Sequence, residues 1–212
     1  MCSGRVDMAF VLRAFANGAD GVFIGGCWLG ECHYVTEGNY DALSMMHLSR
    51  KVLEQVGINP QRLRLEWIAG SEGMRYAEVM NDFGKQLKEL GPLGTGEGIS
   101  KEGLKFKFKA VTKILPFLKL VERERLRVRF KTEEEYNEYF SSDEVNKLIS
   151  ELVADKLAIS QITTLLGEKP LSTREISEIL HLEASDVARY LNSSARQGLV
   201  RYDTSQKNYA IA

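Results

Sequence analysis

The chain contains only three cysteines, and their positions suggest soft-metal or redox chemistry. Cys27 and Cys32 are separated by four residues in a glycine-rich stretch, Cys2 lies at the start of the sequence, and His33 follows Cys32 directly. Thiolates bind soft metals and iron–sulfur clusters, and they also exchange with disulfides. The stretch 21–40 therefore predicts a metal or thiol-redox site, with Cys2 as a further candidate.

The spacing of the thiols leaves several kinds of site open. The plant-type [2Fe–2S] motif opens with the same gap of four residues, although its other cysteines are absent here. A structural zinc ion needs four ligands, which Cys2, Cys27, Cys32 and His33 could supply together. A thiol-redox pair usually has two intervening residues. A nucleophilic cysteine needs a positioned base, and sequence adjacency does not place the His33 ring against either thiol. His47 lies within the helix expected at 39–56 and is expected on its surface.

The elements around the cysteines predict a small parallel sheet. Residues 22–24 form an apolar run typical of a buried strand, and Gly25 and Gly26 permit a sharp turn after it. Residues 63–67 alternate apolar and charged side chains and predict a second strand. Because two strands make a small sheet for three helices, we expect a further strand from a preceding segment or a partner chain. The helices are expected at about 8–16, with Asp7 as the N-cap, and at 39–56 and 74–90, an order typical of α/β units.

The middle of the chain, residues 93–142, changes in composition. Residues 93–100 are rich in glycine and predict a flexible linker, because no strand precedes them as a phosphate loop would require. From Lys101 to Lys131 eleven basic residues accompany three acidic ones. This segment is either a solvated amphipathic surface or a docking surface for an acidic partner or nucleic acid. Thr132 is expected to cap an acidic helix over 133–140.

Residues 143–212 have the pattern of a winged helix-turn-helix module. Helices are expected up to residue 166, at 174–180 and at 184–197, followed by a hairpin over 199–212. Between residues 155 and 212 seven basic residues are balanced by seven acidic ones. DNA affinity depends largely on neutralising phosphates, and this module lacks the necessary excess of positive charge. We therefore favour docking to a protein over the reading of DNA.

The overall composition excludes several classes of protein. The 212 residues include 28 Lys and Arg and 29 Asp and Glu, so the net charge predicts no polyanion partner. No apolar run is long enough to cross a membrane, and the first residues lack the apolar segment of a secretory signal. Three cysteines are too few for a disulfide framework. The expected compartment is the cytoplasm.

Several separated motifs resemble the delta subunit of methyl-viologen-reducing hydrogenase. The resemblance covers about residues 1–92 and implies an iron–sulfur domain of α/β fold. Outside the resemblance, residues 93–142 are expected to form a connector, and residues 143–212 a mostly helical, winged-helix-like domain. The motifs are Met-Cys-Ser-Gly-Arg-Val-Asp at 1–7, Ala-Asp-Gly-Val-Phe-Ile-Gly-Gly-Cys at 19–27, Gly-Glu-Cys-His-Tyr at 30–34, Gly-Asn-Tyr at 38–40 and Arg-Leu-Glu-Trp-Ile at 64–68.

The family implies an electron-transfer subunit that is not an enzyme by itself. It would link a hydrogenase or dehydrogenase to a heterodisulfide reductase A-like flavoprotein, and its cofactor would be a [2Fe–2S] cluster. By position, Cys2, Cys27 and Cys32 match cysteines of the family and are the candidate ligands. His33 is expected to donate a hydrogen bond near the cluster or to replace a ligand, and Trp28 to shield the cluster or contact the partner.

Three glycines complete the candidate site. Gly25, Gly26 and Gly30 are expected to let the backbone approach the cluster closely, so that N–H groups bond its sulfur atoms.

The chain also departs from the family pattern. The family has further cysteines and a strand before the first motif, so the fourth ligand is expected outside this chain or is not identified. Trp28 and Leu29 replace the more usual His-Pro between the cysteines. The alternative function is a redox- or metal-responsive winged-helix regulator that binds DNA, and a structural zinc module is a third hypothesis.

Overall fold

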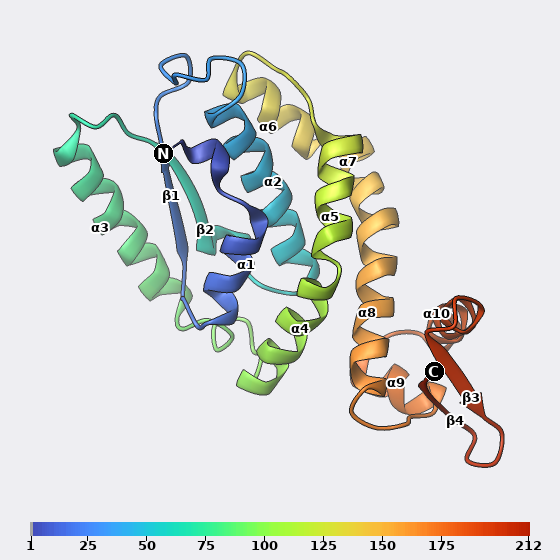
Figure 1. Cartoon of the computed structure of the whole chain (residues 1–212). Coiled ribbons are helices and arrows are strands. Elements are labelled where there is room, and N and C mark those ends of the chain that lie inside the picture. The colour runs from blue at the N-terminus through green and yellow to red at the C-terminus, as the bar shows by residue number, and fades with distance from the viewer. Residues whose placement is uncertain (1) are drawn as a thin grey trace.

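The computed structural model describes residues 2–212, and within them the N-terminal part is built on two short parallel strands (Figure 1). Strand β1 (Val22–Gly26) pairs with β2 (Leu63–Trp67), with Val22 opposite Leu63 and Gly26 opposite Trp67. Helix α2 (Asn39–Gln55) connects the two strands. The predicted mixed α/β fold with a small parallel sheet is therefore confirmed for this part of the chain.

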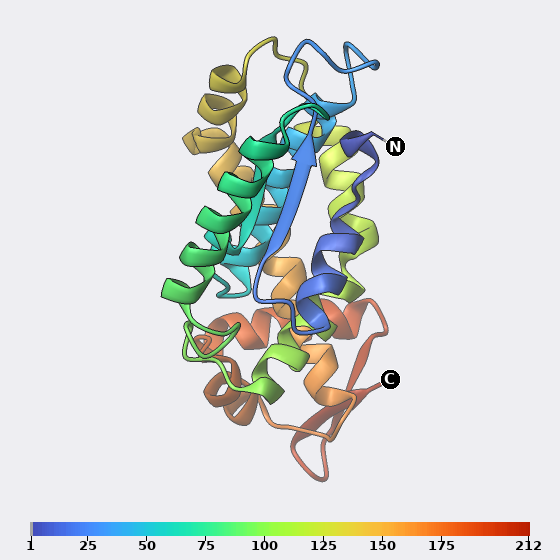
Figure 2. The ribbon, with the colours of Figure 1, turned by 90° about the vertical axis from the view of Figure 1, so that its left-hand side faces the viewer.

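Helices cover both faces of this sheet. Figure 1 shows α1 (Met8–Ala16) and α2 on one side of the strands and α3 (Gly73–Leu90) on the other, and Figure 2 shows β1 running between α1 and α3. The side chain of Asp7 accepts a hydrogen bond from the Ala9 N–H (2.8 Å) and caps α1, as predicted. Short 3₁₀ turns precede α1 and β2, at Ser3–Arg5 (η1) and Pro60–Arg62 (η2).

The middle of the chain is helical and shares its core with the N-terminal part. One continuous cluster of buried apolar side chains extends from Met8 to Leu157. None of the helices between residues 2 and 212 combines the length and apolar character needed to cross a membrane. The elements of this region are α4 (Lys101–Lys113), α5 (Leu115–Val121), the π-helix η3 (Glu122–Leu126), α6 (Glu133–Ser141), α7 (Asp143–Ile149), the π-helix η4 (Ser150–Ala154) and α8 (Asp155–Leu166).

Helix α6 packs on α2 through aromatic rings. Thr132 and Glu135 form a reciprocal capping box at its start, which confirms the predicted cap. The ring of His47 stacks on Phe140 with centroids 4.9 Å apart. We expected His47 on the surface, and this expectation is wrong, because α6 covers that side of α2 and leaves the imidazole half-buried.

The glycine-rich residues 93–100 form hydrogen-bonded turns around a buried ion pair. Arg62 has no exposed surface, and its Nε lies 2.6 Å from Oε1 of Glu97. The backbone N–H groups of Asn59 and Gly94 donate to the same carboxylate. The segment that we expected to be a flexible linker is therefore fixed to the start of β2, while the domain boundaries remain a prediction.

Residues 158–212 pack around a second cluster of buried side chains. Helix α8 belongs to both clusters, since Leu157 lies in the first and Ala158 and Ile162 lie in the second. A helix pair, α9 (Thr173–Leu180) and α10 (Ala184–Arg196), is followed by an antiparallel hairpin of β3 (Val200–Asp203) and β4 (Asn208–Ile211) (Figure 1). Leu171 and Tyr209 form a further β-bridge that ties the hairpin to the segment before α9.

Candidate thiol site

Two cysteines that are thirty residues apart in sequence meet beyond the carboxyl end of β1. The Sγ atoms of Cys2 and Cys32 lie 3.7 Å apart. Cys2 directly precedes η1, and Cys32 lies in the loop between β1 and α2. Cys32 is buried and Cys2 is partly exposed, and within residues 2–212 all three cysteines are free thiols. This close approach joins two of the three predicted ligands.

Glycines without side chains allow the two cysteine segments to meet. A Cβ atom on Gly4 would collide with the backbone of Gly38, and a Cβ atom on Gly38 would collide with Sγ of Cys32 and press against Sγ of Cys2. Gly38 also has a positive φ of 50°, which L-residues rarely adopt. Reasoning from residue types missed both glycines as site residues, although both lie in the motifs that carry the family resemblance.

The three predicted glycines differ in their surroundings. A Cβ atom on Gly26 would meet the ring of Trp67 and Oγ of Ser3, so this residue is required for close packing. Gly30 has open space around it but a φ of +87°, so its requirement is conformational. Gly25 is exposed, and a Cβ atom there would make only an ordinary contact with Phe23. Their proposed approach to a cofactor remains a prediction.

The two paired thiols have different proton affinities. Burial opposes ionisation of Cys32, but hydrogen bonds from the N–H groups of Tyr34 and Asn39 and the nearby thiols of Cys2 and Cys27 lower its pKa. Burial raises the pKa of Cys2, the Gly4 N–H opposes this effect, and the neighbouring Cys32 raises the pKa further. Cys32 is therefore the thiol that ionises first, with Cys2 as its hydrogen-bond donor.

The other two candidate ligands, Cys27 and His33, are exposed. Cys27 is exposed at the end of β1, and its thiol is one of the groups that lower the pKa of Cys32. His33 is exposed, and its ring lies edge-on to Tyr34 with centroids 5.2 Å apart. Among residues 2–212 no group of three or more His, Cys, Asp or Glu side chains is arranged to hold a metal ion. The ligand roles of Cys27 and His33 therefore remain predictions.

The side chains of Asn39 and Trp28 fix the loop that carries Cys27. The side-chain Nδ2 of Asn39 donates to the carbonyl oxygens of Cys27 (3.0 Å) and Trp28 (2.8 Å). The indole Nε1 of Trp28 donates to Glu72 (2.8 Å), and the guanidinium of Arg75 lies over its ring, 4.9 Å from the centroid. Trp28 is thus anchored to the start of α3. Asn39 was not among the predicted site residues.

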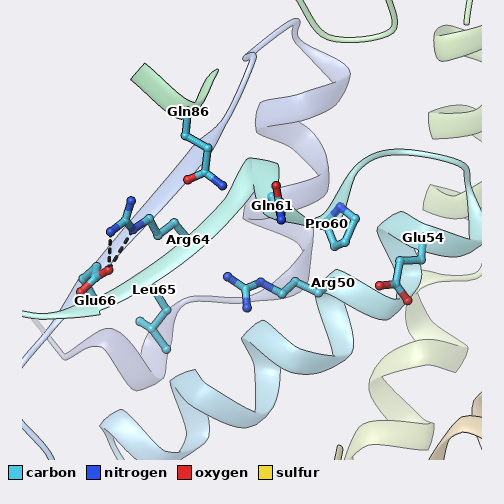
Figure 3. A pocket seen from close by; sticks show the side chains of 8 residues that line it. All are labelled: Arg50, Glu54, Pro60, Gln61, Arg64, Leu65, Glu66 and Gln86. Atoms are coloured by element: carbon cyan, nitrogen blue, oxygen red, sulfur yellow. Dashed lines mark hydrogen bonds and ion pairs between the residues drawn. The ribbon is translucent and has the colours of Figure 1, made fainter. Parts of the chain in front are cut away.

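A separate pocket of about 460 Å³ lies at the outer edge of β2, and its lining contains neither cysteine nor histidine (Figure 3). Arg50 donates from Nε and Nη2 to the Leu63 carbonyl (3.0 and 2.8 Å), and Arg64 pairs with Glu66 (2.8 Å). Arg75 donates to the Trp67 carbonyl in the same way (3.1 Å). Because arginines occupy outward-facing carbonyls of β2, this edge is protected against pairing with another strand.

Comparison with known proteins places the thiol site in a recognised sequence family. The family of the methyl-viologen-reducing hydrogenase delta subunit matches residues 1–91. The D-type iron-sulfur subunit of the F420-non-reducing hydrogenase of Archaeoglobus profundus is 56% identical over 91 residues, which are 43% of this chain and 66% of that protein. The corresponding vhc iron-sulfur subunit of Methanococcus voltae is 44% identical over 101 residues, which are 48% of this chain and 69% of that protein.

A second kind of relative is much longer than the matched segment. The A-type subunit of the ferredoxin/F(420)H(2)-dependent CoB-CoM heterodisulfide reductase of Methanosarcina acetivorans is 46% identical over 95 residues. These residues are 45% of this chain but only 12% of that protein. The chain therefore spans about two thirds of the hydrogenase subunits and a small part of the reductase protein, and the family match over residues 1–91 includes the three cysteines.

Proposed function

Because the chain belongs, through residues 1–91, to the family of methyl-viologen-reducing hydrogenase delta subunits, we propose that it is an iron–sulfur subunit that transfers electrons between larger redox proteins. The observation that carries this proposal is the 3.7 Å approach of the Cys2 and Cys32 sulfur atoms inside the matched region. A cluster bound there would accept and release one electron at a time. No substrate chemistry is required of this chain itself.

The donor set fits an iron–sulfur cluster in its chemistry. Cys2, Cys27 and Cys32 would hold the cluster, because thiolate sulfur is the ligand that iron–sulfur clusters take. The positive end of α2 and the N–H groups of Tyr34 and Asn39 favour a negatively charged sulfur at Cys32. We propose a [2Fe–2S] cluster whose fourth ligand is His33 or a residue outside this chain.

The names of the relatives support the identity of the partners. Related segments occur as a separate iron-sulfur subunit of hydrogenases and as part of the A-type subunit of a heterodisulfide reductase. A segment that occurs in both kinds of protein is a candidate for the contact through which electrons pass between a hydrogenase and a heterodisulfide reductase. We therefore propose a hydrogenase or dehydrogenase as one partner and a heterodisulfide reductase A-like flavoprotein as the other.

The C-terminal module is proposed to be a winged helix that docks to a protein. In this proposal α9 and α10 are the helix-turn-helix, the β3–β4 hairpin is the wing, and the module follows residues 93–142 as a connector. Arg189, on the outer side of α10, is engaged by Asp155 (3.4 Å) and Asp186 (3.3 Å). A cation that is already paired has less charge to offer a phosphate, and this observation disfavours the DNA-binding regulator.

Anaerobic reconstitution with iron and sulfide tests the proposal. We expect the chain, purified without oxygen, to bind iron and sulfide in equal amounts and to develop visible absorption that dithionite bleaches. Cys2→Ser and Cys32→Ser should each abolish this absorption, whereas Ser205→Ala, in the exposed turn of the β3–β4 hairpin, should retain it. Binding of zinc without iron would reject the proposal in favour of a structural zinc module.

A further inference from the structure

We propose that Asn39 is the positioning residue of the thiol site, because this one side chain and its own backbone N–H connect Cys27 to Cys32. The proposal rests on the proposed function in that it takes these thiols as ligands. It assigns to Asn39 the task of holding the two ends of the cysteine loop, residues 27–32, in a fixed relation to each other.

The hydrogen bonds of Asn39 reach both ends of the loop. Its Nδ2 uses both hydrogens, one toward the Cys27 carbonyl (3.0 Å) and one toward the Trp28 carbonyl (2.8 Å). Its backbone N–H donates to the sulfur of Cys32. Within residues 2–212, the one backbone–backbone hydrogen bond inside the loop runs from the Glu31 N–H to the Trp28 carbonyl (3.0 Å).

The orientation of the Asn39 amide is determined by these acceptors. A carbonyl oxygen can only accept, so the NH₂ group and not Oδ1 must face Cys27 and Trp28. As a result Oδ1 of Asn39 is buried without a hydrogen-bond partner among residues 2–212. An unpaired buried acceptor is costly, and a side chain needed only to fill space would carry no such atom. The two donor hydrogens are therefore the feature of the residue that the site uses.

The residue is itself rigidly placed. Asn39 has no exposed surface and begins α2, whose residues Leu43, Leu48 and Val52 are also completely buried in the main core. A side chain fixed to a packed helix positions a loop more accurately than contacts from another loop would. The cysteine loop is exposed at Cys27, Gly30 and Glu31, and Asn39 holds its backbone in addition to the contacts that the Trp28 side chain makes with α3.

Variants of Asn39 test the assignment against a matched control. Asn39→Asp preserves the size of the side chain and removes the amide donors, and Asn39→Ala removes the side chain. Ser49→Ala serves as the control, because Ser49 is equally buried in α2 but bonds to Met45 and not to the cysteine loop. The probe is Cd²⁺ added to the reduced full chain, with binding followed by thiolate–metal absorption. Site-resolved alkylation of Cys32 by iodoacetamide provides a second measurement that needs no metal.

We expect both Asn39 variants to bind Cd²⁺ about 10- to 100-fold more weakly, the range typical when a residue that orients metal ligands is lost. Alkylation of the buried Cys32 should become about tenfold faster as the loop opens locally, and Ser49→Ala should change neither quantity. Unchanged Cys32 alkylation in both variants would overturn the proposal. So would global unfolding of both variants with Ser49→Ala folded, since Asn39 would then support the whole fold.

If the wild-type chain binds neither Cd²⁺ nor a cluster, the proposed function fails on its own. The alkylation rates then still decide whether Asn39 holds the loop, so the two failures are distinguishable.

Discussion

The guanidinium of Arg62 and the carboxylate of Glu97 form a buried ion pair that fixes the glycine-rich segment 93–100 against the start of β2. Nε of Arg62 lies 2.6 Å from Oε1 of Glu97, and its Nη2 lies 3.2 Å from Oε2. The remaining guanidinium hydrogens bond to carbonyl oxygens of Asp20, Leu90 and Gly91. One arginine thus joins three chain segments, and the pair connects the cysteine-bearing part to the helices that follow.

Removal of Glu97 should destabilise the whole chain. In Glu97→Ala the buried Arg62 loses its only carboxylate partner within residues 2–212, and we expect unfolding to become easier by about 3 to 5 kcal/mol. Denaturant titration measures this change. Glu89→Ala, an exposed glutamate near the end of α3, is the control and should change stability by less than about 0.5 kcal/mol. Equal effects of the two substitutions would contradict a structural role for the pair.

Gly38→Ala should separate the paired thiols. The new methyl group would collide with Sγ of Cys32 and would also require a strained positive φ. Diamide should then oxidise Cys2 and Cys32 to a disulfide at least about tenfold more slowly than in the wild type, because disulfide formation depends on a short Cβ separation. Mass spectrometry of proteolytic fragments measures the rate.

Gly18→Ala provides the matched comparison for Gly38→Ala. Gly18 also has a positive φ, of 90°, but has open space where a Cβ atom would lie. Its substitution should reduce stability by about 1 kcal/mol through backbone strain alone and leave the oxidation rate unchanged. A slower oxidation in both variants would attribute the effect to strain and not to crowding of the sulfur atoms.

His47 should make the stability of the chain depend on pH. Burial lowers the pKa of its imidazole to about 4, and repulsion by Arg50 and Lys51 adds to this effect. The unfolded chain takes up the proton below pH 6.5, whereas the folded chain takes it up only near pH 4. Stability contributed by neutral His47 is therefore complete above pH 6.5 and is lost as the pH falls toward 4.

The expected loss amounts to about 2 to 3 kcal/mol, after allowance for the part of the ring that remains solvated. Urea titrations between pH 4 and pH 7.5 measure it. In His47→Gln, which cannot take up a proton, this part of the pH dependence should disappear. If His47→Gln keeps the pH dependence of the wild type, the loss of stability at low pH comes from protonation of carboxylates and not from His47.

Local pattern predicted the elements of the fold better than it predicted their contacts. The alternation at 63–67 and the caps at Asp7 and Thr132 are determined by neighbouring residues, and both kinds of prediction are confirmed. Residues 93–100 were expected to be flexible because glycine favours turns and linkers alike. The difference depends on Arg62, thirty-five residues away from Glu97, and no local pattern carries that information.

The candidate site was predictable in its thiols and not in its supports. Thiols bind soft metals and react with oxidants, so Cys2 and Cys32 could be chosen as candidates by residue type, and their role as ligands stays a prediction. In the sequence, Gly38 and Asn39 have the pattern of an ordinary helix start. The contact of Gly38 with the Cys32 sulfur and the hydrogen bond of Asn39 to the Cys27 carbonyl become visible only in the folded structure. The burial of His47 could not be predicted from α2 alone, because the residue is covered by α6, whose position the local sequence pattern does not give.

The C-terminal module should bind DNA no more tightly than a generic weakly basic surface. The charges of residues 155–212 balance, and Arg189 is already paired with Asp155 and Asp186. We expect dissociation constants no lower than about 10⁻⁶ to 10⁻⁴ M at physiological salt, the range of non-specific binding. Fluorescence anisotropy with genomic fragments at several salt concentrations measures this. Asp186→Asn, which frees Arg189 from one carboxylate, should strengthen binding and steepen its salt dependence. Tight, sequence-selective binding by the wild type would instead support the regulator.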